Sequence, residues 1–288
     1  MSCREQAAGG RERQQPNRRD FLAGLGAAAL IPLVGRRDKL RRIGIQLYTV
    51  RREFARDPEG TLAQLAQIGF QEVEFAGYPP GTPNAIRALL DKHRLRAPSS
   101  HVDLKSVRTD WERTLDRAAT IGQRYVVVAF VGVNERRTLS DWKSLAGEFN
   151  RAGEAAAKRG LRFAYHNHDV EFPLLEGEVP YDVLLRETDP KLVSFEMDLY
   201  WITKGGKDPL AYFARWPGRF PMVHVKDMDA TPRQFFADLG TGTIDFRRIF
   251  AKGKQAGIQH YFYEQDETPG DAFASARLAY GYLRSLTY

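Results

Sequence analysis

The sequence predicts a single α/β domain, built as a (β/α)8 barrel of eight parallel strands. Short apolar strands alternate with helical stretches eight times, at a spacing of roughly 30 residues. Glycine follows four of the helical stretches directly before a strand, at Gly69, Gly122, Gly160 and Gly257, which is a common way for a helix to end. Repeated strand–helix units favour parallel strands, and closure into a barrel is the simplest arrangement. An open, doubly wound sheet is the alternative fold, although no Gly-x-Gly-x-x-Gly follows the first strand to indicate a dinucleotide site.

The elements are expected in a regular order along the chain. The predicted strands are Ile43–Tyr48, Glu72–Phe75, Ala97–His101, Tyr125–Phe130, Leu161–Asn167, Val193–Asp198, Met222–Lys226 and His260–Glu264. The predicted helices are Glu59–Ile68, Asn84–His93, Trp111–Ile121, Ser140–Arg159, Tyr181–Glu187, Pro209–Arg215, Asp245–Ala256 and Asp271–Leu286.

The first 42 residues have the composition of a leader and a linker. Arg18 and Arg19 precede an apolar run from Phe21 to Gly35, a pattern that resembles a twin-arginine export signal. The run is short and rich in Ala and Gly, so it does not predict stable membrane insertion. We expect a signal peptide over 1–35, a charged linker over 36–42 and the barrel over 43–288, with a periplasmic or otherwise extracytoplasmic location. The alternative is a chance arginine pair before a short helix.

Charge and cysteine content exclude several functions. The formal net charge is +7, but residues 1–42 contain ten Lys/Arg against four Asp/Glu, which leaves 33 against 32 in the rest. The barrel is therefore nearly neutral and is not expected to bind nucleic acid. Cys3, the one cysteine, lies in the leader, so the barrel has no disulfide, cysteine zinc site or cysteine nucleophile. The oligomeric state stays open, a homo-oligomer included.

Several predicted strands alternate apolar with polar residues, whereas parallel strands buried on both faces are usually apolar throughout. Because side chains alternate faces, the apolar set should pack against the helices and the polar set should line the barrel lumen. Such a lumen is costly to bury unless its groups are paired or bind a metal ion. Its predicted polar members, near the carboxyl ends where barrel enzymes place their active sites, are Glu74, His101, His166, His168, Asp198, His224, Lys226 and Glu264.

Four of these residues stand at the ends of successive strands. His166, Asp198, His224 and Glu264 belong to the predicted fifth, sixth, seventh and eighth strands. Adjacent strands lie about 4.8 Å apart, so their ends can converge on one ion. Two imidazoles and two carboxylates suit a single divalent ion, Mn²⁺, Co²⁺, Fe²⁺ or Zn²⁺. Single residues of this kind are often structural, but four on successive strand ends favour a metal site.

From Ile43 onward the chain resembles the xylose isomerase-like TIM-barrel superfamily, described as sugar phosphate isomerases and epimerases. The phrases that carry the resemblance are Gly44-Ile-Gln-Leu-Tyr48, Phe70-Gln-Glu-Val-Glu74, Ser100-His101, Tyr165-His-Asn-His168, Glu196-Met-Asp198, Val223-His-Val-Lys-Asp227 and Tyr263-Glu264. The resemblance implies a divalent metal held by the ends of strands five to eight, with Asp198, His224 and Glu264 at the family's ligand positions. It also implies a small-molecule carbohydrate substrate.

The chain departs from the family pattern at the fifth strand, where many epimerases have Glu and this chain has His166. The Tyr-His-Asn-His form resembles a branch that includes enzymes acting on 3-keto-glycosides by elimination or hydration. His168 faces the same way as His166 and competes with it for the ligand role.

The remaining polar residues are assigned roles around the predicted ion. We expect His168 and Glu74 to act as base or acid and Lys226 to carry developing negative charge. For Glu74 an ion pair with Lys226 or His101 is the alternative. The predicted substrate-binding residues are Gln46, Tyr48, His101 and Trp201, of which Trp201 has a packing role as its alternative.

These residues predict an enzyme that removes the proton beside a carbonyl of a keto-carbohydrate, with the metal as Lewis acid. The first hypothesis is an isomerase or epimerase acting through an enediolate. The alternative is a 3-keto-glycoside lyase or hydratase on the same scaffold. A metal-dependent endonuclease-like barrel and a carbohydrate-binding barrel without catalysis are further alternatives.

Overall fold

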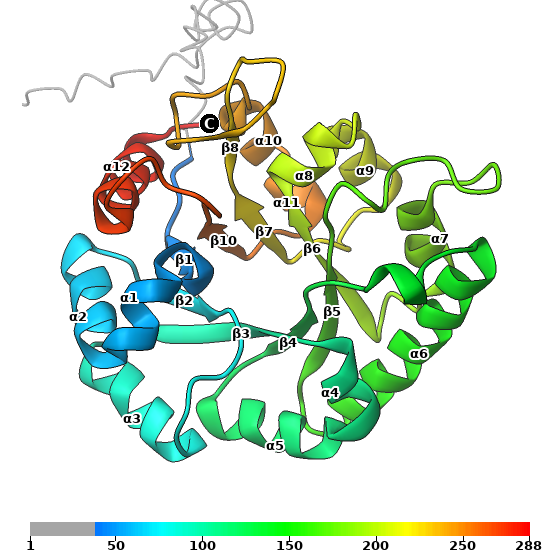
Figure 1. Cartoon of the computed structure of the whole chain (residues 1–288), viewed down its shortest axis with the longest axis horizontal. Helices are drawn as coiled ribbons and strands as arrows, with labels where there is room; N and C mark the ends of the chain where they lie inside the picture. Colours follow the sequence, from blue (N-terminus) through cyan, green and yellow to red (C-terminus); the bar gives the residue numbers. More distant parts are fainter. Residues whose placement is uncertain (1–37) are drawn as a thin grey trace, which may run out of the picture. The chain divides into compact units, whose positions relative to one another are not determined.

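In a computed structural model, which describes residues 38–288, eight parallel strands close into a barrel with helices around it (Figure 1). The barrel order is β1-β10-β7-β6-β5-β4-β3-β2. The strands are β1 (Gly44–Gln46), β2 (Glu72–Phe75), β3 (Arg96–Val102), β4 (Tyr125–Val128), β5 (Arg162–His166), β6 (Val193–Asp198), β7 (Met222–Val225) and β10 (His260–Tyr263). The predicted fold is confirmed.

Helices occupy the connections between strands. They are α1 (Arg51–Arg56), α2 (Pro58–Ile68), α3 (Pro83–Lys92), α4 (Leu104–Thr109), α5 (Trp111–Ile121), α6 (Leu139–Ala157), α7 (Pro180–Glu187), α8 (Leu199–Lys204), α9 (Pro209–Arg215), α10 (Phe246–Phe250), α11 (Gly253–Ala256) and α12 (Ala272–Ser285), with single 3-10 turns η1 (Leu47–Val50) and η2 (Val133–Glu135). Among residues 38–288, no helix is both long and apolar enough to span a membrane.

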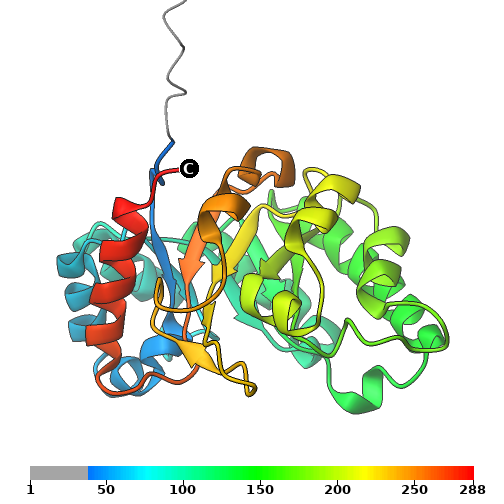
Figure 2. The same cartoon turned by 90° about the horizontal axis from the view of Figure 1, so that it is seen from above.

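The twin-arginine leader, with Arg18 and Arg19, lies outside the described residues, as do the first two linker residues. The described part of the linker is tied to the end of the chain: Asp38 and Tyr288 exchange two backbone hydrogen bonds of 2.8 and 3.1 Å. Figure 2 shows the result, with α12 in red beside the first strand in blue.

The predicted alternation of faces is also found. The apolar residues Ile45, Val73, Phe195 and Val223 belong to the large core between the strands and the helices. A separate small apolar cluster consists of Tyr125, Val127, Ala164, Met222 and Phe262. The Phe262 ring of this cluster packs against both His224 and His260, with centroids 6.2 and 6.1 Å away. Gly44 leaves room for it, because a Cβ there would lie 2.5 Å from the Phe262 ring, its partner on β10.

Several predicted element bounds were wrong by one or two residues, and two of the differences from the prediction have a clear local cause. The first strand ends at Gln46 rather than Tyr48, because the Gln46 side chain accepts a hydrogen bond from the Tyr48 amide and starts a 3-10 turn. The segment Asp245–Ala256 forms two helices rather than one, because the backbone leaves the helical region at Lys252, before a glycine of low helix propensity.

Three six-residue helices and one hairpin were not predicted. Helices α4 and α8 begin directly after β3 and β6, each with an aspartate side chain, Asp103 or Asp198, accepting a hydrogen bond from a first-turn amide. The strands β8 (Asp227–Met228) and β9 (Phe236–Ala237) form a two-stranded antiparallel hairpin that follows β7. These short elements surround the carboxyl ends of the barrel strands.

Candidate active site

Two groups of potential metal ligands lie inside the carboxyl end of the barrel, on either side of the buried His224 imidazole. The outer group is Asp198, His224 and Glu264; the inner group is His101, His166, Glu196 and His224. Within each group the ligand atoms lie within 4.8 Å of one another. Strand register produces this convergence, since Asp198 pairs with His224 across β6 and β7, and His166 with Glu196 across β5 and β6.

The outer group contains three of the four predicted ligands. His224 Nδ1 lies 2.9 Å from Glu264 Oε2 and 3.9 Å from Asp198 Oδ2. Asp198 Oδ1 accepts a hydrogen bond from the Trp201 amide. Oδ2 is buried and receives no hydrogen bond from the described residues, and it forms an ion pair of 3.1 Å with the Lys226 ammonium. Two carboxylates and an imidazole fit a divalent ion.

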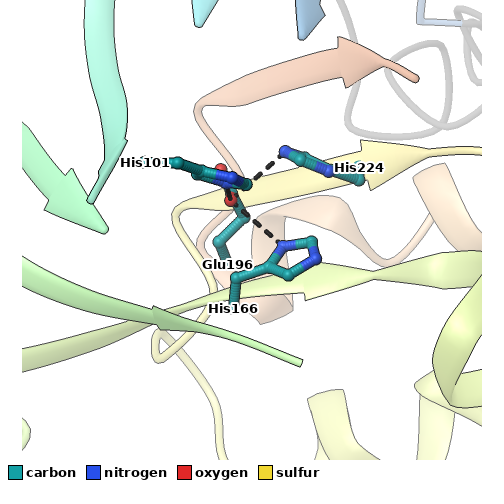
Figure 3. Close-up of side chains that lie close together, drawn as sticks. All are labelled: His101, His166, Glu196 and His224. Carbon is teal, nitrogen blue, oxygen red and sulfur yellow. Dashed lines mark hydrogen bonds and ion pairs between the residues drawn. The ribbon is translucent and has the colours of Figure 1, made fainter. Parts of the chain in front are cut away.

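The inner group contains the fourth predicted ligand, His166, whose Nδ1 lies 3.2 Å from Glu196 Oε2 (Figure 3). The same oxygen is 2.7 Å from His101 Nε2 and 3.2 Å from His224 Nε2. The structure therefore places His166 beside Glu196 rather than with Asp198 and Glu264. Glu196, one layer deeper on the same strand as Asp198, was not among the residues predicted for the site.

Glu74 and Gln46 are completely buried, and Glu74 contacts two histidines of the inner group. Glu74 Oε2 accepts a hydrogen bond of 2.8 Å from Gln46 Nε2 and lies 2.7 Å from His224 Nε2 and 3.4 Å from His101 Nε2. Burial and the nearby Glu196 charge raise the pKa of Glu74. These contacts correspond to the alternative interpretation of Glu74 as an ion-pair partner of His101.

Lys226 is buried among three carboxylates. Its Nζ lies 2.7 Å from Glu264, 2.8 Å from Asp266 and 3.1 Å from Asp198, and the ring of Trp201 is 5.4 Å away. Burial opposes the positive charge, but the carboxylates outweigh it and hold the pKa of Lys226 well above its usual value. The site therefore keeps a fixed ammonium ion beside the outer group.

His168 follows β5 and is only partly buried. Its backbone N–H donates a 2.8 Å hydrogen bond to the buried Glu171, while its Nδ1 has no hydrogen-bond partner among residues 38–288. Burial and the charge of Lys226 lower the pKa of His168 to about 3, so the imidazole is neutral. A neutral, unpartnered imidazole can accept a proton. Trp201 packs at 5.4 Å from this ring, which places it behind His168 and matches its alternative packing role.

A cavity of about 650 Å³ opens over these groups. The polar part of its wall includes His101, His166, His168, Lys226, Glu264 and Asp266. Its aromatic and apolar part includes Tyr48, Tyr78, Val102 and Phe130. Of the predicted substrate-binding residues, Tyr48 and His101 therefore reach the cavity.

Sequence reasoning missed Asp266 on the polar wall. Burial raises the pKa of this carboxyl group to about 6, against the opposing effect of Lys226. A signal for it was present, because Asp266 lies two residues after Glu264 and so shares its face if the strand alternation continues. Tyr78 and Phe130 follow strands two and four as isolated aromatic residues, and the sequence carried no comparable signal for them.

Residues 62–285 match the sequence model of one protein family, described as "Xylose isomerase-like TIM barrel". The chain belongs to this family. The predicted resemblance is thus confirmed, and the family places the chain among enzymes.

Two relatives and one protein that shares the fold illustrate the range. Inosose dehydratase of Geobacillus kaustophilus is 25% identical over 79% of this chain and 86% of the relative. A sugar phosphate isomerase/epimerase of Parabacteroides distasonis is 26% identical, with a TM-score of 0.74 over 85% of this chain and 93% of the other. An IOLI protein crystallised with a bound zinc atom shares the fold, at 14% identity and a TM-score of 0.66 over 83% and 95% of the two chains.

Proposed function

We propose that this protein is a metal-dependent lyase that eliminates water, or another β-oxygen group, from a keto-carbohydrate. The observation that carries the proposal is one polar cavity wall that combines the neutral imidazole of His168, the ammonium of Lys226 and the carboxyl group of Asp266 beside the outer group. The dehydratase relatives support elimination more directly than the isomerase/epimerase reaction that was the first hypothesis from sequence.

Each part of an elimination reaction can be assigned to one residue of the site. His168 takes the proton from the carbon next to the carbonyl, and Lys226 stabilises the negative charge that develops on oxygen. Asp266 gives a proton to the departing hydroxyl group, which leaves as water while the carbon–carbon double bond forms. Glu171 holds the backbone of His168 in place through its 2.8 Å hydrogen bond.

Asp198, His224 and Glu264 would hold one divalent ion, Mn²⁺, Co²⁺, Fe²⁺ or Zn²⁺. When bound, such an ion supplies Lewis-acid stabilisation beside the substrate carbonyl. The zinc-bearing relative of the same fold supports a metal in this family without selecting the ion for this chain.

Isomerisation or epimerisation is the second candidate, and the 26% identical isomerase/epimerase structure favours it. Both reactions begin with the same proton abstraction and differ in whether a β-oxygen group leaves. The presence of Asp266 as a proton donor on the cavity wall favours departure of that group.

The test is to incubate the Mn²⁺- or Co²⁺-loaded protein with an inosose, with 3-keto-glycosides and with simple keto-sugars, and to follow products by mass spectrometry. We expect loss of water or of the aglycone, with growth of ultraviolet absorbance from the conjugated carbonyl. Asp266→Asn should slow this product while leaving exchange of the α-proton with deuterated water. A product of unchanged mass would overturn the lyase proposal in favour of the isomerase.

We also propose export through the twin-arginine pathway, on the basis of Arg18 and Arg19 before the apolar run. Changing both residues to lysine should retain the protein in the cytoplasm, as measured by fractionation of expressing cells. A matched Arg36→Lys/Arg37→Lys variant, altered after the run, should still be exported. Unchanged localisation of the first variant would refute this proposal.

A further inference from the structure

The inner group has the spacing of a metal-ligand set of its own. Three imidazole nitrogens converge on one carboxylate oxygen, Glu196 Oε2, at 2.7 Å from His101 and 3.2 Å from both His166 and His224 (Figure 3). Glu74 Oε2 adds a second carboxylate at 2.7 Å from His224 Nε2. Ligands about 2.1 Å from one tetrahedral ion lie roughly 3.4 Å apart, so these separations are close to those around a single ion.

The inner group contains two buried carboxylates with oxygen atoms that lack partners. Glu74 and Glu196 are both fully buried, and the Oε1 atom of each receives no hydrogen bond within the described chain. Leaving such oxygen atoms unpartnered is costly. A divalent ion can accept them as ligands and neutralise both carboxylates, without placing positive charge on imidazole rings whose centroids lie 4.5–5.3 Å apart.

The two nitrogens of His224 face different groups. Its Nδ1 points to Glu264 of the outer group, and its Nε2 points to Glu74 and Glu196 of the inner group. Once its ring N–H has given up its proton to solvent, the imidazolate of His224 can serve a ligand set on each side of its ring. Each side has two carboxylates, Asp198 and Glu264 outside and Glu74 and Glu196 inside. Lys226 contacts both outer carboxylates as well as Asp266. A divalent ion on the inner side offsets the charge of Glu74 and Glu196.

We propose that His101, His166, Glu196 and the Nε2 side of His224 form a second divalent-cation site, with Glu74 as a further ligand. Three imidazoles with carboxylates select a borderline ion such as Zn²⁺ or Co²⁺. The site lies below the cavity and goes beyond the proposed function, which uses the outer group. Its role is to fix His224 and His166 by neutralising the buried carboxylates.

Metal stoichiometry tests this site. The full chain is stripped with a chelator, reloaded separately with Zn²⁺ and Co²⁺, freed of excess ion by gel filtration and analysed for metal per chain. We expect about two ions per chain in the wild type, as two separate ligand sets require. Glu196→Gln should retain about one, which is the ion of the outer group.

A matched control is Glu72→Gln. Glu72 is also a buried glutamate of a lumen strand, but it pairs at 2.8 Å with His260, away from both groups, so this variant should still bind about two ions. If circular dichroism shows that Glu196→Gln does not fold, His101→Gln provides the same test, because His101 is another proposed ligand of this site and lies on the cavity wall.

The proposal is overturned by one ion in the wild type, by an unchanged content in the Glu196 variant, or by loss of both ions in that variant. The result is independent of the proposed reaction, because it is read from bound metal. A failed lyase assay with two bound ions would refute the function and leave this site intact.

Discussion

Asp198→Asn is expected to lose the ion of the outer group and to lower kcat/KM by roughly 10³-fold, or about 4 kcal/mol of transition-state stabilisation. The change removes the charge of the carboxylate oxygen Oδ2, which lies 3.1 Å from the Lys226 ammonium and faces the outer group. Asparagine keeps the oxygen that accepts the Trp201 amide hydrogen bond, so helix α8 retains its cap. The loss should therefore report on metal binding rather than on folding.

The measurement combines metal content, steady-state kinetics and thermal unfolding of the same preparation. Asp245→Asn is a suitable control, because Asp245 also caps a short helix through an amide hydrogen bond but lies outside both ligand groups. It should leave the metal content and kcat/KM unchanged. If Asp198→Asn retained full metal content and full activity, the outer group would not be the metal site of the reaction.

The sequence was a good guide to which strand and which face each polar residue occupies. The alternation in Val193–Asp198 places Ser194, Glu196 and Asp198 on the face opposite the apolar residues. All three side chains are buried. This follows from strand geometry, which fixes a period of two whatever the tertiary context.

The depth of each residue in the barrel was much less predictable. Depth depends on the stagger between strands, which the pattern of a single strand does not contain. The pairing of β2 with β3 shifts in register between Glu72 and Glu74, which helps to bring His101 opposite Glu196 and beside Glu74. Glu74 and Gln46 consequently lie below the cavity, although their faces were assigned correctly.

Asp266 was missed for a related reason. It lies after the end of β10, where the chain has left the strand, and its place on the cavity wall depends on its contact with Lys226. Lys226 itself lies just beyond β7. The alternation indicated the face of each residue, but the contact between Lys226 and Asp266 is made by segments that follow two strands, and strand periodicity does not specify such contacts.

The different roles assigned to His166, at the end of β5, and His168, two residues later, give the sharpest test of the proposed chemistry. His168→Gln should keep the metal content of the wild type and lower kcat by about 10²–10⁴-fold, the usual contribution of a general acid or base. The reason is geometric: His168 lines the cavity, its Nδ1 has no partner, and it belongs to neither ligand group. His166→Gln should instead reduce metal binding, because it removes an imidazole 3.2 Å from Glu196.

A third variant separates the missing base from a disturbed structure. His168→Ala leaves space on the cavity wall that free imidazole can enter, so added imidazole should restore part of kcat without changing the metal content. The same addition should not rescue His166→Ala, whose ring is buried against Glu196. If His168→Gln lost metal while His166→Gln kept it, the two histidines would have exchanged roles and the base would be His166.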